Sequence, residues 1–258
     1  MPLLCAPLKD AVHPCGYFDD LTAVTEHFFL KGYGPAELDS LLERGYRHFG
    51  KYFFRPRCGD CVRCVPIRVA VENFRFSRNA RRVINRASGF RIAEGPPKPT
   101  REAYALYLTH LRRFRGQDPS EYDRFAEAFF DPLSGARQLS VYDGGRLIAV
   151  SHYDRGKEAL SAVYTYYDDS YTRESLGRMV IYELIRRARE EGIPYLYLGY
   201  YIEENRHMVY KGGYKPNEIL TSEGSWRTFY DAEGGRCISR EDMGFVPGER
   251  FFRTGARE

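Results

Sequence analysis

The feature that most constrains the fold of this chain is a strand, a helix and a second strand in its second half. Residues 160–167 and 195–202 are rich in the aromatic and branched residues typical of strands. Between them a helix is predicted over residues 175–190, and Gly192 and Pro194 end it. A crossover of this kind joins two parallel strands, is almost always right-handed, and puts the start of the helix beside a strand end. The predicted apolar stripe of the helix consists of Leu176, Met179, Val180, Leu184, Ile185 and Ala188.

Two further strands are predicted immediately before this unit. Residues 138–142 and 146–153 flank the turn at Asp143-Gly144-Gly145, and a second turn at residues 155–158 leads into the strand 160–167. The three strands form an antiparallel meander. A meander followed by a crossover is typical of an acetyltransferase-like (GNAT-like) acyl-transfer domain, so the predicted fold class is α/β (α+β) with a smaller, cysteine-containing basic domain ahead of it.

A proline-rich stretch at residues 95–100 is the predicted linker, because proline lacks a backbone donor and disfavours both helix and central strand. Residues 101–130 have a helical pattern with a break near Gly116 to Pro119, and their aromatic residues are predicted to be core. No stretch of the chain is apolar and long enough to span a membrane. The predicted parts are an N-terminal domain (1–94), the linker (95–100), a C-terminal domain (101–240) and a tail (241–258).

Three cysteines lie at intervals of three in the run from Cys58 through Cys61 to Cys64. A loop with this spacing can turn its thiolates toward one metal centre, as in zinc and iron–sulfur sites. Both sites need a fourth ligand, for which Cys15 is the prediction, ahead of Cys5 and Cys237. The alternative is that these cysteines are small buried apolar residues. A disulfide framework is disfavoured because the chain is long enough to bury its own core and has no secretory signal, and we expect a cytoplasmic protein.

Positive charge is concentrated in one part of the chain. Residues 44–91 contain thirteen Lys or Arg against Asp60 and Glu72, so this segment carries +11 while the whole chain carries +4. Such asymmetry favours a polyanionic partner, since phosphate neutralisation releases counterions. Within it, Ser77 is the predicted N-cap of a helix whose exposed arginines would contact a tRNA backbone. Those arginines are Arg78, Arg81, Arg82 and Arg86. The alternative is an ordinary solvated face, although acidic partners nearby are nearly absent.

Several ordered motifs, spread over about residues 13–222, resemble the aminoacyl-tRNA–protein transferase family. The chain is most similar to the bacterial branch that transfers leucine, which itself resembles the eukaryotic arginyltransferases. The N-terminal motifs are Gly45-Tyr46-Arg47, Tyr52, Arg55-Pro56, the three cysteines, Pro66, Arg68 and Phe76 to Arg82. The C-terminal motifs are Leu160 to Tyr164, Tyr167-Asp168, Ser175-Leu176-Gly177, Tyr195 to Tyr200 and Met208 to Lys211.

The chain departs from the family pattern at three places that bear on donor and acceptor specificity. His48 and Phe49 stand where the family usually has Arg and Ser. An Arg-His pair is replaced by residues 113–115, and Asp169 takes the place of a proline. The fold assignment does not depend on these positions.

The resemblance implies aminolysis of an aminoacyl-tRNA ester by the α-amine of a protein beginning with Asp or Glu, as an N-degron signal for degradation. No cofactor is required for this chemistry, and the cysteines would hold an iron–sulfur cluster or zinc, or no metal. Asp168 is the predicted base or ammonium-orienting group, with loop capping as its alternative role. Backbone amides at Ser175, Leu176 and Gly177 are predicted to stabilise the oxyanion or bind the terminal ribose-phosphate.

Other polar residues are predicted to bind the two substrates. Tyr200 and Tyr201 would stack on the terminal adenine, and Lys211 would pair with a phosphate or with the acceptor carboxylate. The cations predicted to recognise an acidic N-terminus are Arg47, His48, Lys51 and Arg55.

Three alternatives to leucyl transfer stay open. Arginine could be the donor, and a metal-stabilised RNA-binding module would account for the basic helix and the cysteines without catalysis. A simple RNA-binding module, however, would leave the strand–helix–strand unit without a function. An acyl-CoA-dependent acetyltransferase would need a glycine-rich pyrophosphate loop before the helix, and residues 173–177 contain only a fragment of one.

Overall fold

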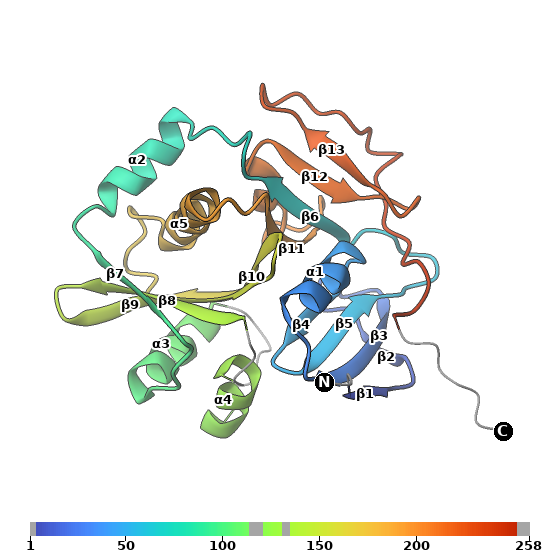
Figure 1. Ribbon diagram of the computed structural model, residues 1–258, viewed down its shortest axis with the longest axis horizontal. Coiled ribbons are helices and arrows are strands. Elements are labelled where there is room, and N and C mark those ends of the chain that lie inside the picture. The colour runs from blue at the N-terminus through green and yellow to red at the C-terminus, as the bar shows by residue number, and fades with distance from the viewer. Residues whose placement is uncertain (1–3, 114–120, 131–134, 252–258) are drawn as a thin grey trace.

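The computed structural model describes residues 4–113, 121–130 and 135–251, and these form two sheets with helices around them (Figure 1). The predicted break at Gly116 to Pro119 and the departure at Phe114-Arg115 lie outside the described residues. The first sheet has the strand order β1-β3-β5-β4, with β2 paired to β3. Its elements are β1 (Leu4–Pro7), β2 (Ala11–Pro14), β3 (Thr22–Lys31), α1 (Pro35–Glu43), β4 (Arg47–Phe49) and β5 (Tyr52–Pro56).

The second sheet has eight strands in the order β13-β12-β6-β11-β10-β9-β8-β7. Among the described strands of this sheet, β10 and β11 are the one parallel pair, and the other neighbours are antiparallel. The strands are β6 (Val65–Ala70), β7 (Arg91–Gly95), β8 (Ala136–Asp143), β9 (Arg146–Arg155), β10 (Ala159–Tyr167), β11 (Tyr195–Tyr201), β12 (Asn217–Leu220) and β13 (Trp226–Tyr230). The helices are α2 (Arg78–Arg86), α3 (Arg101–Leu111), α4 (Tyr122–Phe130), α5 (Leu176–Glu190) and the 3-10 turn η1 (Val209–Gly213).

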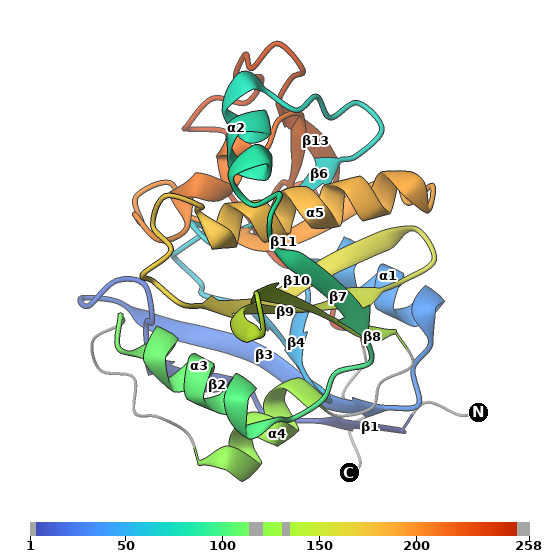
Figure 2. The ribbon, with the colours of Figure 1, turned by 90° about the vertical axis from the view of Figure 1, so that its left-hand side faces the viewer.

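Helices cover both faces of the second sheet. Figure 2 shows α5 on one side of β9 and β10, with α2 beyond it, and α3 and α4 on the other side. The whole predicted stripe of α5 is buried. On the opposite face, Phe125 is fully buried among Tyr104, Tyr107 and Phe129, so these aromatic residues are core as predicted. Among the described helices, none is long and apolar enough to cross a membrane.

The strand–helix–strand unit and the antiparallel meander are confirmed. β8, β9 and β10 are antiparallel neighbours, and α5 connects β10 to the parallel strand β11. This order of strands is the acetyltransferase-like arrangement expected from the sequence, and the fold class is α/β. Ser77 accepts a hydrogen bond from the backbone N–H of Ala80 at 3.1 Å, so it caps α2 as predicted.

The predicted linker does not coincide with the division between the two sheets. Strands β6 and β7 precede residues 95–100, yet β6 pairs with β11 and β12, and β7 pairs with β8. Gly95 itself is the last residue of β7 and lies opposite Gln138. The chain therefore enters the larger sheet at Val65, immediately after the cysteine run. The two sheets also share a core, because Ala159 and Tyr197 pack among the buried residues of the first sheet and α1.

Candidate functional site

The central strands β10 and β11 of the larger sheet separate toward their C-terminal ends. β10 and β11 are paired only from Ala159–Tyr195 to Ser161–Tyr197, although each strand continues for several residues. The pairing of each strand with its other neighbour is irregular just beyond this point, at residues 162–164 of β10 and 197–199 of β11. Backbone groups on the facing edges of the two strands are thereby released from the ladder and become available to other partners.

Arg47 reaches across from β4 to the point where the strands part. Its guanidinium donates one hydrogen bond to Ser161 Oγ at 2.8 Å and another to the carbonyl oxygen of Ala162. Burial lowers the pKa of Arg47, although its ordinary value is so high that the group stays charged. The first sheet thus inserts a positive charge into the second.

Lys211 of η1 brings a second cation to the same place. It is 8% exposed, and its Nζ donates to the carbonyl oxygen of Tyr200 at 2.9 Å. Gly199 lies between the two cations, with φ of +86°. A Cβ at this glycine would lie 3.4 Å from Arg47 Nε and 3.6 Å from Lys211 Nζ. Burial, and secondly the charge of Arg47, lower the pKa of Lys211 to about 7.

Neither cation has a carboxylate partner among the described residues. The hydrogen-bond acceptors of Arg47 and Lys211 are neutral atoms of Ser161, Ala162, Tyr200 and, more distantly, Met208. Asp154 acts on Arg47 through space, but its Oδ2 is 2.7 Å from His48 Nε2. Arg47 is charged, and an anion between the two groups would favour the protonated form of Lys211, so this region is suited to an anionic ligand.

The cysteines lie next to this pair of cations. Burial raises the pKa of the Cys64 thiol to about 12, with further contributions from Cys61, Cys15 and Cys58, while Lys211 acts in the opposite direction. The predicted fourth ligand, Cys15, is therefore near Cys64 although it is 49 residues before it in the chain. This gathering has the donor chemistry of a zinc or iron–sulfur site.

The spacing between the thiols is not that of a metal site. In the part of the chain that the structure describes, no three His, Cys, Asp or Glu side chains are close enough together to hold a metal ion. Cys58 Sγ instead accepts a hydrogen bond from the backbone N–H of Val24 at 3.3 Å. The four residues thus fit a metal by chemistry and not by geometry. Cys237 is an exposed free cysteine whose thiol is within weak hydrogen-bonding distance of Asp231 and of the Gly235 carbonyl oxygen.

The arginines of α2 form an exposed face. Ala80 and Val83 point into the core, whereas all four predicted arginines are exposed, and none of them forms an ion pair with a described carboxylate. Arg86 Nη1 donates to the carbonyl oxygen of Arg173 at 3.0 Å, which connects α2 to the loop before α5. The basic face therefore extends toward the start of the crossover helix.

The start of α5 lies beside the end of β10. Ser175 precedes the helix in a left-handed conformation with φ of 53° and makes no side-chain capping bond. A Cβ at Gly177 would lie 3.0 Å from the ring of Tyr167, so a glycine is needed for this close packing. The first backbone N–H groups of a helix have no acceptor within the helix, which leaves those of Leu176 and Gly177 available.

Asp168 is held by its neighbours. Its Oδ1 accepts hydrogen bonds from the Ser170 backbone N–H at 3.0 Å and from Ser170 Oγ at 2.6 Å, and Arg146 pairs with its other oxygen. Burial acts to raise the pKa of Asp168, but the bonds from Ser170 and the charge of Arg146 outweigh it and lower the pKa. A carboxylate stabilised in this way is a weak base. The geometry corresponds to the alternative role, capping of the loop before α5.

Four predicted substrate-binding residues are engaged within the protein. His48 is 4% exposed and bonded to Asp154, and Arg55 is 1% exposed and paired with Glu26. Tyr200 donates its hydroxyl to the carbonyl oxygen of Gly45 at 2.9 Å, and Tyr201 is 2% exposed against Phe229. His48 and Arg55 already have carboxylate partners inside the protein, and the rings of Tyr200 and Tyr201 are covered, so the structure does not support these four predictions. Lys51 lies in the β4–β5 turn, at the opposite end of that hairpin from Arg47.

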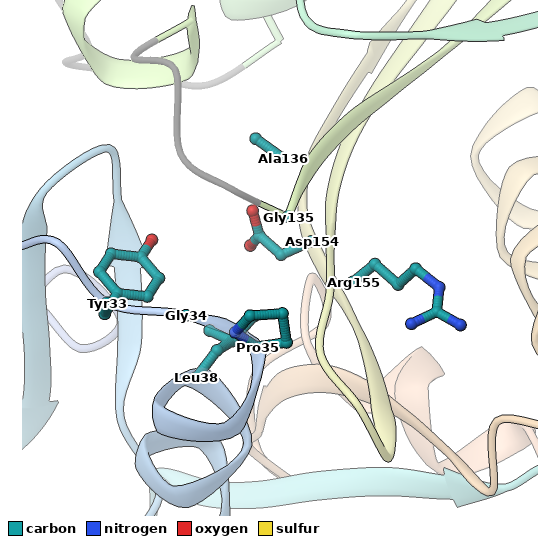
Figure 3. Close-up of a pocket in the computed structure, with 8 residues that line it drawn as sticks. All are labelled: Tyr33, Gly34, Pro35, Leu38, Gly135, Ala136, Asp154 and Arg155. Carbon is teal, nitrogen blue, oxygen red and sulfur yellow. The ribbon is translucent and has the colours of Figure 1, made fainter. Parts of the chain in front are cut away.

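A narrow opening elsewhere in the molecule does not serve as the site. Figure 3 shows it between the start of α1 and the end of β9, with the Asp154 carboxylate pointing into it and Arg155 pointing away. It has no room for a water molecule. Asp154 is also hydrogen-bonded to His48, so this opening offers no place for a substrate.

Sequence reasoning missed two residues of the site. Ser161 is fully buried and anchors Arg47, and Tyr17 is 37% exposed and lies within electrostatic range of Arg47 and Cys64. A serine inside the otherwise apolar run 160–163 was the only signal for Ser161, because a buried hydroxyl needs a partner.

The chain matches two domain families over separate parts of its length. Residues 13–82 match the N terminus of arginine-tRNA-protein transferase, and residues 102–221 match its C terminus. Curated proteins named aspartate/glutamate leucyltransferase are similar over most of the chain. The protein from Alcanivorax borkumensis is 33% identical over 85% of this chain and 92% of its own length. The protein from Granulibacter bethesdensis is 32% identical over 94% of this chain and 92% of its own length.

Two solved structures are similar to part of this chain at low sequence identity. The C-terminal domain of a putative lysylphosphatidylglycerol synthetase from Agrobacterium fabrum is 11% identical with a TM-score of 0.44, covering 55% of this chain and 47% of that domain. The ribosomal-protein-S18-alanine N-acetyltransferase from Escherichia coli is 16% identical with a TM-score of 0.31, covering 40% of this chain and 63% of that enzyme. The sequence matches to both transferase domains and to near-full-length relatives show that this chain belongs to the arginine-tRNA-protein transferase family.

Proposed function

We propose that this protein transfers leucine from leucyl-tRNA to the α-amine of proteins whose first residue is Asp or Glu, which marks them for degradation. The observation that carries the proposal is the match to relatives named aspartate/glutamate leucyltransferase along 80–94% of this chain. Arginine is the competing donor, since the family description names arginine-tRNA. An aminoacyl-tRNA substrate also implies a cytoplasmic location.

The reaction is aminolysis of an activated ester. The α-nitrogen of the acceptor forms a bond to the aminoacyl carbonyl carbon, the ester bond to the terminal ribose breaks, and the ribose hydroxyl leaves. The acceptor ammonium loses one proton in the process. Because the ester is already activated, the protein has to align the substrates and stabilise the developing oxyanion, with no cofactor required for the chemistry.

Three features of the fold support this chemistry. The unpaired arginines of α2 offer charge-assisted hydrogen bonds to tRNA phosphates. The amides of Leu176 and Gly177, at the start of α5, offer donors to an oxyanion or to the terminal ribose-phosphate. The strands β10 and β11 part beside this helix, as required for two substrates to meet between them. For Asp168 we propose a structural role in fixing the loop before α5.

We also propose that Cys15, Cys58, Cys61 and Cys64 bind zinc or an iron–sulfur cluster in a structural role. The thiols of Cys15, Cys58 and Cys61 all lie within electrostatic range of Cys64, which supports a shared site, although ligation requires the thiols to move closer together. Metal analysis and a visible absorption spectrum of anaerobically purified protein distinguish the two metals. Cys61→Ser is expected to lose the metal and to unfold at a lower temperature, whereas Cys237→Ser should keep both properties. Full metal content in Cys61→Ser would contradict the assignment.

The transfer reaction itself is the test of function. Radiolabelled leucyl-tRNA and arginyl-tRNA are offered in parallel with acceptor peptides that begin with Asp, Glu or Ala. We expect leucine on the Asp and Glu peptides only. Arginine incorporation would assign the other donor. Binding of tRNA without transfer from either donor would favour the RNA-binding module.

A further inference from the structure

We propose that Arg47 and Lys211 together hold the side-chain carboxylate of the acceptor's first residue and so select Asp and Glu. This inference rests on the proposed function and deepens it, because it names the residues that read the acceptor. It separates these two cations from the arginines of α2, which we assign to the tRNA backbone.

The first argument is the balance of charge. In the described parts of the chain, Arg47 and Lys211 have only neutral acceptors, although both lie in a largely buried region. Elsewhere in the same basic segment, the buried guanidinium of Arg55 is paired with Glu26. A buried cation without a carboxylate is costly unless an anion arrives with a ligand. The acidic acceptor side chain is such an anion.

The second argument is the separation of the two cations. Since Arg47 Nε and Lys211 Nζ both lie near the position that a Cβ of Gly199 would occupy, they are within about 7 Å of each other. One carboxylate can bridge this separation, with one oxygen about 2.8 Å from each nitrogen. Gly199 has no side chain to compete for the space, and its positive φ strains any other residue.

The third argument is location. The α-nitrogen of Asp is separated from its own side-chain carboxylate by only a few bonds, so the cations that hold the carboxylate must lie next to the reacting ester. Arg47 and Lys211 are bonded to Ser161, Ala162 and Tyr200, which lie on the facing strands where β10 and β11 part. Tyr17 is 37% exposed and lies within electrostatic range of Arg47, so the guanidinium is close to the molecular surface. The small carboxylate of a short Asp or Glu side chain fits this partly buried position better than a bulkier phosphodiester.

Equilibrium binding tests the inference without tRNA or catalysis. Fluorescent peptides that differ only in a first residue of Asp, Asn, Glu or Gln are titrated with the full-length protein, and the affinity ratios Asp/Asn and Glu/Gln are measured by anisotropy. We expect the wild type to prefer the acidic peptides by about 10- to 100-fold, and Arg47→Gln to bring both ratios close to one. Lys211→Met should reduce the same ratios.

Controls separate recognition from folding. Arg91, which lies over the ring of Tyr142 on β7, belongs to neither proposed binding site, and Arg91→Gln should keep the wild-type ratios. Arg47→Lys retains a charge without the guanidinium fork and should restore part of the preference. A melting temperature close to that of the wild type for Arg47→Gln establishes that the variant is folded, and Lys211→Met gives an independent second measurement.

The outcomes distinguish failure of this inference from failure of the proposed function. Equal binding of acidic and amide peptides by the wild type would overturn the inference, even if leucine is transferred. Unchanged ratios in both variants would do the same, and a selective loss of tRNA affinity would assign the pair to the nucleic acid. A selective preference for acidic peptides that disappears in the variants supports the inference, even if neither aminoacyl-tRNA serves as a donor.

Discussion

Two arginines of the same basic segment, eight residues apart, have opposite electrostatic environments. Arg55 donates Nε to Glu26 at 3.0 Å, and its remaining nitrogens bond to the carbonyl oxygens of Arg44, Gly248 and Glu249. Arg47 has two neutral acceptors and no carboxylate partner among the residues that the structure describes. The difference indicates that Arg55 stabilises the fold, whereas Arg47 is available to bind the anionic group of a ligand.

The environment of Arg55 also explains the C-terminal tail, for which the sequence suggests no role. Glu26 is shared by Arg55, Arg57 and the hydroxyl of Tyr46, and both arginines bind the Gly248 carbonyl. Phe251 stacks on Phe28 in the first sheet. The tail is therefore part of a saturated network that joins the first sheet to the chain's last described residues.

The largest expected effect comes from exchanging the two arginines in turn for glutamine. Arg55→Gln removes a main partner of buried Glu26 and should lower the free energy of unfolding by about 3–5 kcal/mol. Arg47→Gln removes a cation that has no internal anion, and the loss of its two neutral hydrogen bonds should lower it by only about 1–2 kcal/mol. Urea denaturation of both variants measures the difference. Equal losses of unfolding free energy in the two variants would mean that Arg47 stabilises the fold as much as Arg55 does.

Acidification provides a second contrast through Glu26. Burial acts to raise the pKa of Glu26, but Tyr46, Arg55 and Arg57 outweigh it and lower the pKa. A carboxyl with a lower pKa in the folded protein binds fewer protons than in the unfolded chain, so its contribution is present at pH 7. That contribution is lost as the pH falls below about 4.3, by up to about 1.4 kcal/mol per pH unit.

Glu26→Gln tests this dependence directly. The variant should be less stable than the wild type at pH 7 by about 2–4 kcal/mol, and the gap should narrow as the pH is lowered toward 3. Urea titrations at each pH measure the gap. Arg47→Gln is the matched control, since it should follow the wild-type pH dependence. A gap that stays constant with pH would show that the charge of Glu26 contributes nothing to the network.

The exposed arginines of α2 should behave differently from both buried ones. A double change of Arg78 and Arg82 to glutamine removes two phosphate contacts, and we expect about tenfold weaker tRNA binding at low salt. The slope of log affinity against log salt should fall by about 2 in magnitude. Peptide selectivity should not change. An unchanged salt slope would show that this face is an ordinary solvated surface.

The contrast between Arg47 and Arg55 also marks the limit of what the sequence could reveal. Local periodicity was sufficient for the meander, for α5 and for the Ser77 cap, because each depends on residues near one another in the chain. It could not identify which arginine meets Glu26, since that carboxylate is 29 residues before Arg55. Local periodicity likewise assigned β6 to the N-terminal domain, because nothing within Val65–Ala70 reveals that this strand pairs with β11 and β12.

The same limit explains the results at the candidate site. Tyrosines 200 and 201 alternate on a strand, and either could be exposed as far as the pattern shows, yet both are buried. Lys211 was assigned to the site from a motif, and the structure brings it beside Arg47, to which no local pattern connects it. Long-range packing, therefore, decides which residues of a motif face a substrate.

The smallest expected effect is a rise in stability caused by the ligand itself. If Arg47 and Lys211 lack an anion in the free protein, a peptide with an N-terminal Asp should stabilise the folded state by about 1.4 kcal/mol at a concentration of ten times its dissociation constant. Differential scanning fluorimetry detects this as a shift of a few degrees in melting temperature. The Asn peptide should give a smaller shift, and Arg47→Gln should abolish the difference between the two peptides. Arg227→Gln, on β13 outside both proposed binding sites, should retain it. The shift depends on binding to the native state alone. If it is present in the wild type and lost in Arg47→Gln, Arg47 binds an anion that the ligand supplies. Arg55 differs because its charge is already paired with Glu26 in the free protein.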